Sequence, residues 1–128
     1  MIIDTSVVVA ILLRESDYVE LTNRVWTENL VGIGAPTLVE CGLVLSRRMR
    51  RDIHSLLDTF LTEANVTVIP FDRKHASIAI EAFQTYGKGR HPAKLNYGDC
   101  LTYATAKVAN RPLLFKGNDF SKTDLWLA

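Results

Sequence analysis

The strongest constraint on the fold is that short, continuously apolar runs alternate with longer segments of helical periodicity. The apolar runs cover residues 1–4, 31–35, 66–70 and 112–115. They lack the alternation of polar and apolar residues that marks a sheet with one solvated face. Continuous apolar runs of this kind are typical of strands covered on both sides. A strand–helix–strand order favours parallel pairing. The sequence therefore predicts an α/β fold with a parallel sheet between helices.

Helix starts are marked by capping residues. Helices are expected at residues 7–14, 17–29, 36–50, 53–64, 74–86 and 97–109. The residues that can begin them are Thr5 and Ser6, Ser16 and Asp17, Pro36, Asp52, Asp72, and Asn96. The one obvious loop, residues 87–92, holds glycine and proline. No linker or repeat interrupts this order, so residues 1–128 are predicted to form one domain.

Composition narrows the class of protein. Of the 128 residues, 48% are hydrophobic, which is enough for a core without disulfides or a structural metal. The two cysteines, Cys41 and Cys100, lie in apolar stretches and are predicted to be reduced and buried. The first residues lack the basic leader of a signal peptide, and no segment has the length of a membrane span. We therefore expect a cytoplasmic protein without a membrane partner.

Four acidic residues stand out because of their neighbours. Asp4 ends the first apolar run and Asp119 follows the last, while Glu40 (LVECGLVL) and Asp99 (NYGDCLTYA) lie among apolar residues. Sites in parallel sheets form outside the carboxyl ends of the strands. A carboxylate in apolar surroundings is costly unless it is protonated, hydrogen-bonded or bound to a cation. Because Mg²⁺ prefers carboxylate oxygens, four converging acids favour a magnesium site.

Each acid also has a purely structural interpretation. Asp4 can cap the first helix, and Asn96 and Asp99 have the spacing of a capping box. Asp119 can start a turn, and Glu40 can occupy a solvated stripe. The metal-site interpretation depends on convergence of the four in space. Other catalytic signatures are missing, since the chain has no P-loop, no GxSxG elbow and no histidines at zinc-binding spacing.

The acidic segments, taken in order, resemble those of PIN domains. The matching segments are Asp4-Thr5-Ser6 after a strand, PTLVE with Glu40, LNYGD with Asp99, and LLFKGNDF with Asp119. Within that family, the run GKGRH…LNYGDC…LLFKGNDF is similar to VapC toxins of bacterial toxin–antitoxin pairs. The resemblance covers nearly the whole chain. It implies a PIN domain over residues 1–128, with a sheet of about four or five strands flanked by helices on both faces.

The resemblance also implies an activity. It points to an Mg²⁺-dependent endoribonuclease toxin, with Mn²⁺ as a substitute, that cleaves cellular RNA by metal-activated water. Asp4 and Asp99 would bind the metal directly, and Glu40 and Asp119 directly or through water. The hydroxyl after the first Asp carries over to Thr5 or Ser6, and Ser6 is the catalytic candidate. The partners implied are a VapB-type antitoxin and a second copy of the chain in a homodimer.

Candidate RNA contacts are basic. Arg90 precedes the helix that bears Asp99, Lys116 precedes Asp119, and Arg47 belongs to a basic run at the end of the helix that bears Glu40. Such a run also fits the negative end of a helix dipole. With basic residues in excess once four acids bind metal, the surface would suit a polyanion. Many relatives have an acid before the last Asp, where this chain has Asn118.

The sequence leaves three other functions open. One is a metal-independent ribonuclease that uses His91 with Lys88 or Lys116. Another is a receiver-like signalling domain with Asp72 as its phospho-acceptor. The third is a catalytically silent PIN-like module that binds RNA or a partner. Among the aromatic residues, only Tyr97 is expected near the site, where it could stack on a base.

Overall fold

The computed structural model describes residues 1–128 and contains one sheet of four parallel strands. The strands are β1 (Ile2–Ile3), β2 (Val31–Gly34), β3 (Val66–Ile69) and β4 (Leu113–Leu114), in the spatial order β3-β2-β1-β4. Ile2 is in register with Gly32 on one side and Leu113 on the other. The prediction of a parallel α/β sheet is confirmed, at the lower end of the expected strand number.

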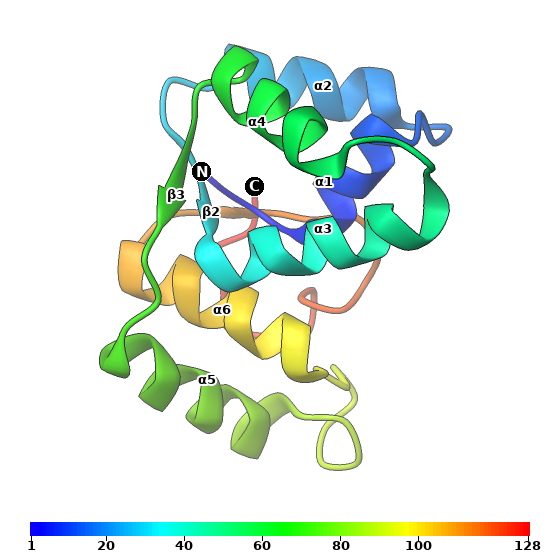
Figure 1. The fold of residues 1–128 in the computed structure, drawn as a ribbon. Helices are drawn as coiled ribbons and strands as arrows, with labels where there is room; N and C mark the ends of the chain where they lie inside the picture. The colour runs from blue at the N-terminus through cyan, green and yellow to red at the C-terminus, as the bar shows by residue number, and fades with distance from the viewer.

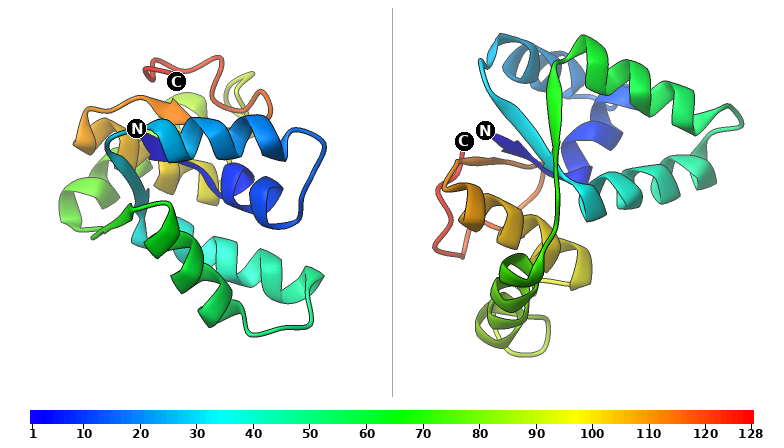
Figure 2. Two further views of the ribbon diagram at one scale, coloured as in Figure 1. Left: turned by 90° about the horizontal axis from the view of Figure 1, so that it is seen from above. Right: turned by 60° about the vertical axis from the view of Figure 1, so that its left-hand side comes forward.

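Six helices cover the sheet, one group on each face. They are α1 (Thr5–Leu12), α2 (Tyr18–Thr27), α3 (Ala35–Arg48), α4 (Ile53–Glu63), α5 (Arg73–Tyr86) and α6 (Tyr97–Ala109). Helices α1 to α4 lie on one side of the strands, and α5 and α6 on the other (Figures 1 and 2). Each side has its own apolar cluster, one including Ile33 and Leu45 and the other including Leu95 and Phe120. This division is what a sheet with two buried faces requires.

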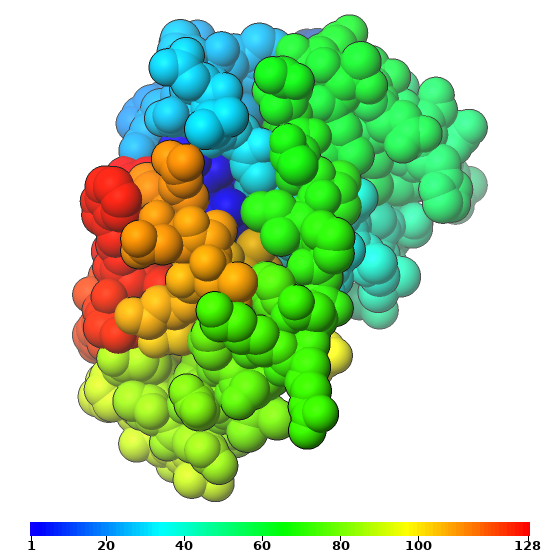
Figure 3. All heavy atoms as spheres, turned by 90° about the vertical axis from the view of Figure 1, so that its left-hand side faces the viewer, coloured from blue at the N-terminus to red at the C-terminus, as the bar shows by residue number.

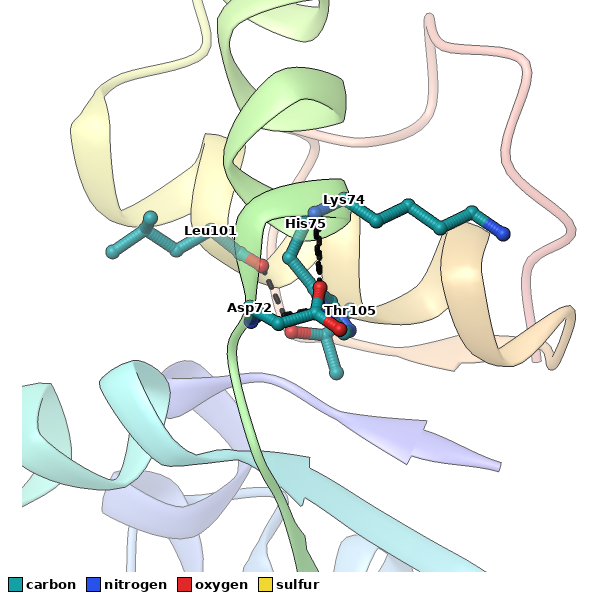
Figure 4. A network of polar contacts seen from close by, with 5 residues as sticks. All are labelled: Asp72, Lys74, His75, Leu101 and Thr105. Carbon is teal, nitrogen blue, oxygen red and sulfur yellow. Dashed lines mark hydrogen bonds and ion pairs between the residues drawn. The ribbon is translucent and has the colours of Figure 1, made fainter.

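Side-chain caps start several helices where the sequence places them. Asp52 accepts a hydrogen bond from the Ser55 N–H, and Asp72 accepts from the N–H groups of Lys74 and His75 (Figure 4). Asp72 therefore acts as a helix cap. No helix is both long and apolar enough to cross a membrane.

The first helix begins earlier than predicted. Of the three caps considered possible, Asp4 rather than Thr5 or Ser6 is the N-cap, and the Asp4 carboxylate accepts a hydrogen bond from the Ser6 N–H at 3.1 Å. The Asp4 N–H donates to the Leu114 carbonyl of β4 at 3.0 Å, which keeps its backbone extended. Because sheet pairing holds Asp4 outside the helix, Thr5 becomes the first helical residue.

The end of the chain covers the outer edge of β4. Leu127 pairs with Leu113, and the Ala128 N–H donates to the Leu113 carbonyl at 2.8 Å. Figure 3 shows this red segment against the orange residues of α6 and β4, with the blue first residues visible only as a small enclosed patch. Covering an edge strand leaves fewer unpaired backbone groups exposed.

Parallel pairing places three segments at one edge of the sheet. Asp4 follows β1, α3 begins directly after β2, and the segment from Phe115 onward follows β4. The carboxyl ends of the strands therefore bring together the residues of the candidate site.

Candidate functional site

Asp4 is the most deeply buried acid of the site, with 8% of its surface exposed. Its Oδ2 accepts hydrogen bonds from the Ser6 N–H at 3.1 Å and the Ser6 hydroxyl at 2.7 Å. Its Oδ1 accepts from the Thr102 hydroxyl at 2.9 Å. Asp4 thus has both oxygens oriented by neutral donors.

Glu40 lies midway along α3 and is partly buried. Its Oε1 accepts a hydrogen bond from the Thr5 hydroxyl at 2.5 Å. On its other side, the carboxylate packs so closely on Gly98 that a Cβ at that position would overlap it. Glu40 is therefore held between the first turn of α1 and the first turn of α6.

Asp99 lies in the first turn of α6 and forms the expected capping box with Asn96. The Asn96 N–H donates to Asp99 Oδ2 at 3.0 Å, and the Asp99 N–H donates to Asn96 Oδ1 at 2.9 Å. Burial, together with the charges of Asp119, Asp4 and Glu40, nevertheless raises the pKa of Asp99 to about 6, against the hydrogen bond from the Asn96 N–H. The other three acids thus lie near enough to Asp99 for their charges to act on it, while Asp99 also caps its helix.

Asp119 is the exposed member of the group. It lies in the bend after β4, beside Phe120, which is 1% exposed. The Phe120 ring packs edge-on against Phe115, with 5.2 Å between the ring centres. This pair, with Phe120 buried and Phe115 partly buried, fixes the loop that carries Asp119.

The four carboxylates have no basic partner. The ion pairs of the chain join His75 to Asp72, Lys107 to Asp124, and Lys116 to Glu15 and Asp17. Converging negative charges without a counter-charge favour a bound cation. No three acidic, histidine or cysteine side chains are arranged to hold a metal by themselves. The donor set still fits Mg²⁺, which is usually held by one or two carboxylates together with waters and substrate phosphates.

Ser6 links two parts of the site. Its hydroxyl donates to Asp4 and accepts a hydrogen bond from the Lys116 N–H at 2.9 Å. The predicted hydroxyl therefore lies beside the carboxylates, where it ties Asp4 to the loop after β4. The other candidate hydroxyl, that of Thr5, donates its hydrogen bond to Glu40 instead.

The three predicted RNA contacts differ in their surroundings. The Lys116 ammonium binds Glu15 at 2.5 Å and Asp17 at 2.9 Å, so its charge is already paired within the protein. The Arg90 guanidinium lies over the Phe83 ring, 5.6 Å from its centre. Arg47 is exposed at the end of α3 and forms no ion pair. Of these three residues, Lys116 is thus paired with acids, Arg90 lies on an aromatic ring, and Arg47 has no ion-pair partner.

Residues outside the carboxylate set have local roles. The Nδ1 atom of His91 accepts a hydrogen bond from the Ala93 N–H at 3.0 Å, and its ring packs on Tyr86. Tyr97, at the start of α6, is 79% exposed. Cys41 and Cys100 are buried, as predicted, and unbridged. Burial raises the pKa of the Cys41 thiol to about 12, which leaves it an inert packing group.

Sequence reasoning missed two buried hydroxyl groups. Thr102 donates to Asp4, and its oxygen lies 3.1 Å from that of Thr37 on α3. The available signal was the spacing of three between Asp99 and Thr102, which puts both residues on one face of α6. The contact with Thr37 could not be inferred, because 65 residues separate the two.

Comparisons with known proteins show the family of the chain. A model of the PIN domain family matches residues 1–125. Ribonuclease VapC36 of Mycobacterium tuberculosis is 42% identical over 130 residues, covering 98% of this chain and 91% of the relative. Ribonuclease VapC of Mycolicibacterium smegmatis is 42% identical over 125 residues, covering 98% of this chain and 97% of the relative.

Two solved structures share the fold at lower sequence identity. Mycobacterium tuberculosis VapC20, described as a toxin that cleaves the sarcin–ricin loop, aligns with a TM-score of 0.77 at 16% identity, covering 97% of this chain and 95% of that chain. VapBC2 from Rickettsia felis, bound to a promoter DNA fragment, aligns with a TM-score of 0.75 at 20% identity, covering 99% and 96%. At such identities the likeness concerns the fold alone.

Proposed function

Because the chain belongs to the PIN domain family, we propose that it is an Mg²⁺-dependent endoribonuclease and the toxin of a toxin–antitoxin pair. Relatives that match almost its whole length are named ribonucleases, which supports the enzyme class. One observation carries the site assignment: the charges of Asp119, Asp4 and Glu40 all act on Asp99, and none of these acids forms an ion pair. A group of carboxylates without ion pairs does not stabilise the fold, but it can bind a cation.

In this proposal, Asp4 and Asp99 hold the metal directly, and Glu40 and Asp119 do so directly or through water. A bound Mg²⁺ or Mn²⁺ ion supplies a water nucleophile at neutral pH and neutralises phosphate charge. Asp4 is suited to bind the metal in a fixed orientation, since three hydrogen bonds orient its oxygens. Asp99 lies among the charges of the other three acids, which raise its pKa and which a bound cation would offset.

Hydrolysis at this site would cleave the bond to the 3′-oxygen and leave 5′-phosphate and 3′-hydroxyl ends. Ser6 keeps Asp4 and the loop after β4 together, so that Asp119 stays beside the carboxylates. Arg47 supplies a free positive charge for the RNA backbone, and Arg90 is a second candidate. Lys116 supports the fold through its two acidic partners instead.

We further propose two protein partners, a VapB-type antitoxin and a second copy of the chain. Large apolar side chains remain exposed on three helices near the site. They are Val39 and Leu43 on α3, Ile80 and Phe83 on α5, and Tyr97 on α6. An exposed apolar group of this kind is typical of a surface that binds protein. Light scattering on the purified chain, alone and with an antitoxin, measures both assemblies.

The test of function is cleavage of total cellular RNA by the purified protein with Mg²⁺, with EDTA, and by the Asp99→Asn variant. We expect discrete fragments with Mg²⁺ and none in the other two samples. Cleavage that survives both treatments would support a metal-independent mechanism through His91. A wild-type protein that cleaves nothing, with Mg²⁺ or Mn²⁺ and free of antitoxin, would point to a silent binding module.

A further inference from the structure

A chain of buried hydroxyl groups ends on the innermost carboxylate of the site. Thr102 Oγ1 is 2.9 Å from Asp4 Oδ1 and 3.1 Å from Thr37 Oγ1. Thr102 is 1% exposed and Thr37 is 3% exposed. The three residues come from the end of β1, from α6 and from α3. Thr37 and Thr102 therefore join α3 of one helical layer to α6 of the other, and Thr102 extends this contact to the carboxylate that follows β1.

The direction of these two hydrogen bonds follows from the donors and acceptors available. An ionised carboxylate only accepts hydrogen bonds, so the single hydroxyl proton of Thr102 points to Asp4. The Thr102 oxygen then accepts from Thr37, whose hydroxyl must be the donor. Hydrogen bonds in such a series polarise one another, which strengthens the last bond to the carboxylate.

Thr102 differs in this respect from the other buried threonine of its helix. Thr105 is equally buried, at 1% exposed, and its hydroxyl donates to the Leu101 carbonyl of the preceding turn at 3.0 Å (Figure 4). That bond is the usual way in which a threonine inside a helix satisfies its hydroxyl. Thr102 instead donates outside its helix, to a carboxylate on another element.

We propose that Thr102, supported by Thr37, is a positioning residue that fixes the Asp4 carboxylate for metal binding, an inference that rests on the proposed function. Ser6 holds only one oxygen of Asp4, and Thr102 is the donor to the other. Together they stop rotation of the carboxylate. Partners that orient a ligand in this way change metal affinity or activity by about 10–100-fold when removed.

The test compares Mn²⁺ and Mg²⁺ affinity of purified variants by titration calorimetry. Thr102→Val removes the hydroxyl and keeps the side-chain shape, so we expect binding about 10–100-fold weaker. Thr102→Ser restores the donor and is expected to bind nearly as the wild type does. Thr105→Val makes the same change one turn along α6, away from Asp4, and is expected to leave affinity unchanged. High Mg²⁺ concentration should restore RNA cleavage by Thr102→Val.

Thr37→Val is a second probe that does not touch Asp4. We expect a smaller loss of Mn²⁺ and Mg²⁺ affinity than for Thr102→Val. If Thr102→Val does not fold, Thr37→Val is used to test the proposal in its place. Affinities of Thr102→Val and Thr37→Val that match Thr105→Val would overturn the positioning role and leave the metal site standing. A wild-type protein that binds neither ion would overturn both the metal site and the positioning role.

Discussion

Replacing Asp99 by Asn should stabilise the metal-free protein, although it removes a central residue of the proposed site. The Asn side chain keeps an oxygen that can accept the hydrogen bond from the Asn96 N–H, so the capping box survives. It removes the charge that burial, Asp119, Asp4 and Glu40 all disfavour. The folded state therefore loses an unfavourable interaction and keeps its local structure.

The size of the effect follows from the pKa of Asp99, which rises from 3.8 to about 6. Each pKa unit corresponds to about 1.4 kcal/mol, which sets an upper limit of about 3 kcal/mol. Solvent screening at this partly buried site reduces the expected gain to about 1–2 kcal/mol. At about 4 °C per kcal/mol for a domain of this size, Asp99→Asn should melt about 4–8 °C higher.

The pH dependence has a definite sign. Because the folded protein binds the Asp99 proton more tightly than the unfolded chain, the wild type loses stability as pH rises from about 4 to about 6. Above that window the loss is complete. Asp99→Asn lacks this loss, so its advantage should develop over the same window and stay constant to pH 8.

The assay is urea unfolding in EDTA from pH 4.5 to pH 8, with Asp58→Asn on the exposed face of α4 as a control for net charge. Added Mg²⁺ should stabilise the wild type and leave Asp99→Asn nearly unchanged. Equal stability of Asp99→Asn and wild type at pH 7.5, or a gain matched by Asp58→Asn, would refute the reasoning.

Three further predictions concern packing and charge. Gly98→Ala places a Cβ against the Glu40 carboxylate, so RNA cleavage should fall at least about tenfold while circular dichroism stays native; full activity would show that the close approach is unnecessary. Leu45→Ala empties a fully buried position of the larger core and should cost about 2–5 kcal/mol in urea unfolding, and a cost under 1 kcal/mol would contradict the packing. Arg47→Gln should lower the salt dependence of RNA binding by about one unit of slope, whereas Lys116→Gln should not, because two acids already pair its charge. The reverse order would restore Lys116 as a phosphate contact.

Local signals in the sequence predicted most of the fold. Asp52, Asp72 and Asn96 cap the helices that they were expected to cap, because a cap depends only on residues two or three positions away. The first helix was placed too late because Asp4, Thr5 and Ser6 are all suitable caps. The choice among them is made by the hydrogen bond from Asp4 to Leu114 of β4, a contact between distant segments.

The candidate site was predictable where topology fixes it and unpredictable where side chains meet across the fold. The acids Asp4 and Asp119 follow parallel strands, so their convergence at one edge was expected. Lys116 lies three residues before Asp119, yet Glu15 and Asp17 bind its ammonium from the start of the chain. Such pairings depend on tertiary structure, and no pattern within the local sequence indicates them.

The most direct test of a single metal-dependent site is the rate of cleavage of a defined RNA across a range of Mg²⁺ concentrations. The variants are Asp4→Asn, Glu40→Gln, Asp99→Asn and Asp119→Asn, with Glu63→Gln on the exposed face of α4 as the matched control. We expect Asp4→Asn and Asp99→Asn to lose several orders of magnitude in rate, the other two site variants to need more Mg²⁺, and Glu63→Gln to behave as wild type. A well-folded Asp99→Asn protein that cleaves at the wild-type rate, or wild-type cleavage that persists in EDTA, would contradict the assignment.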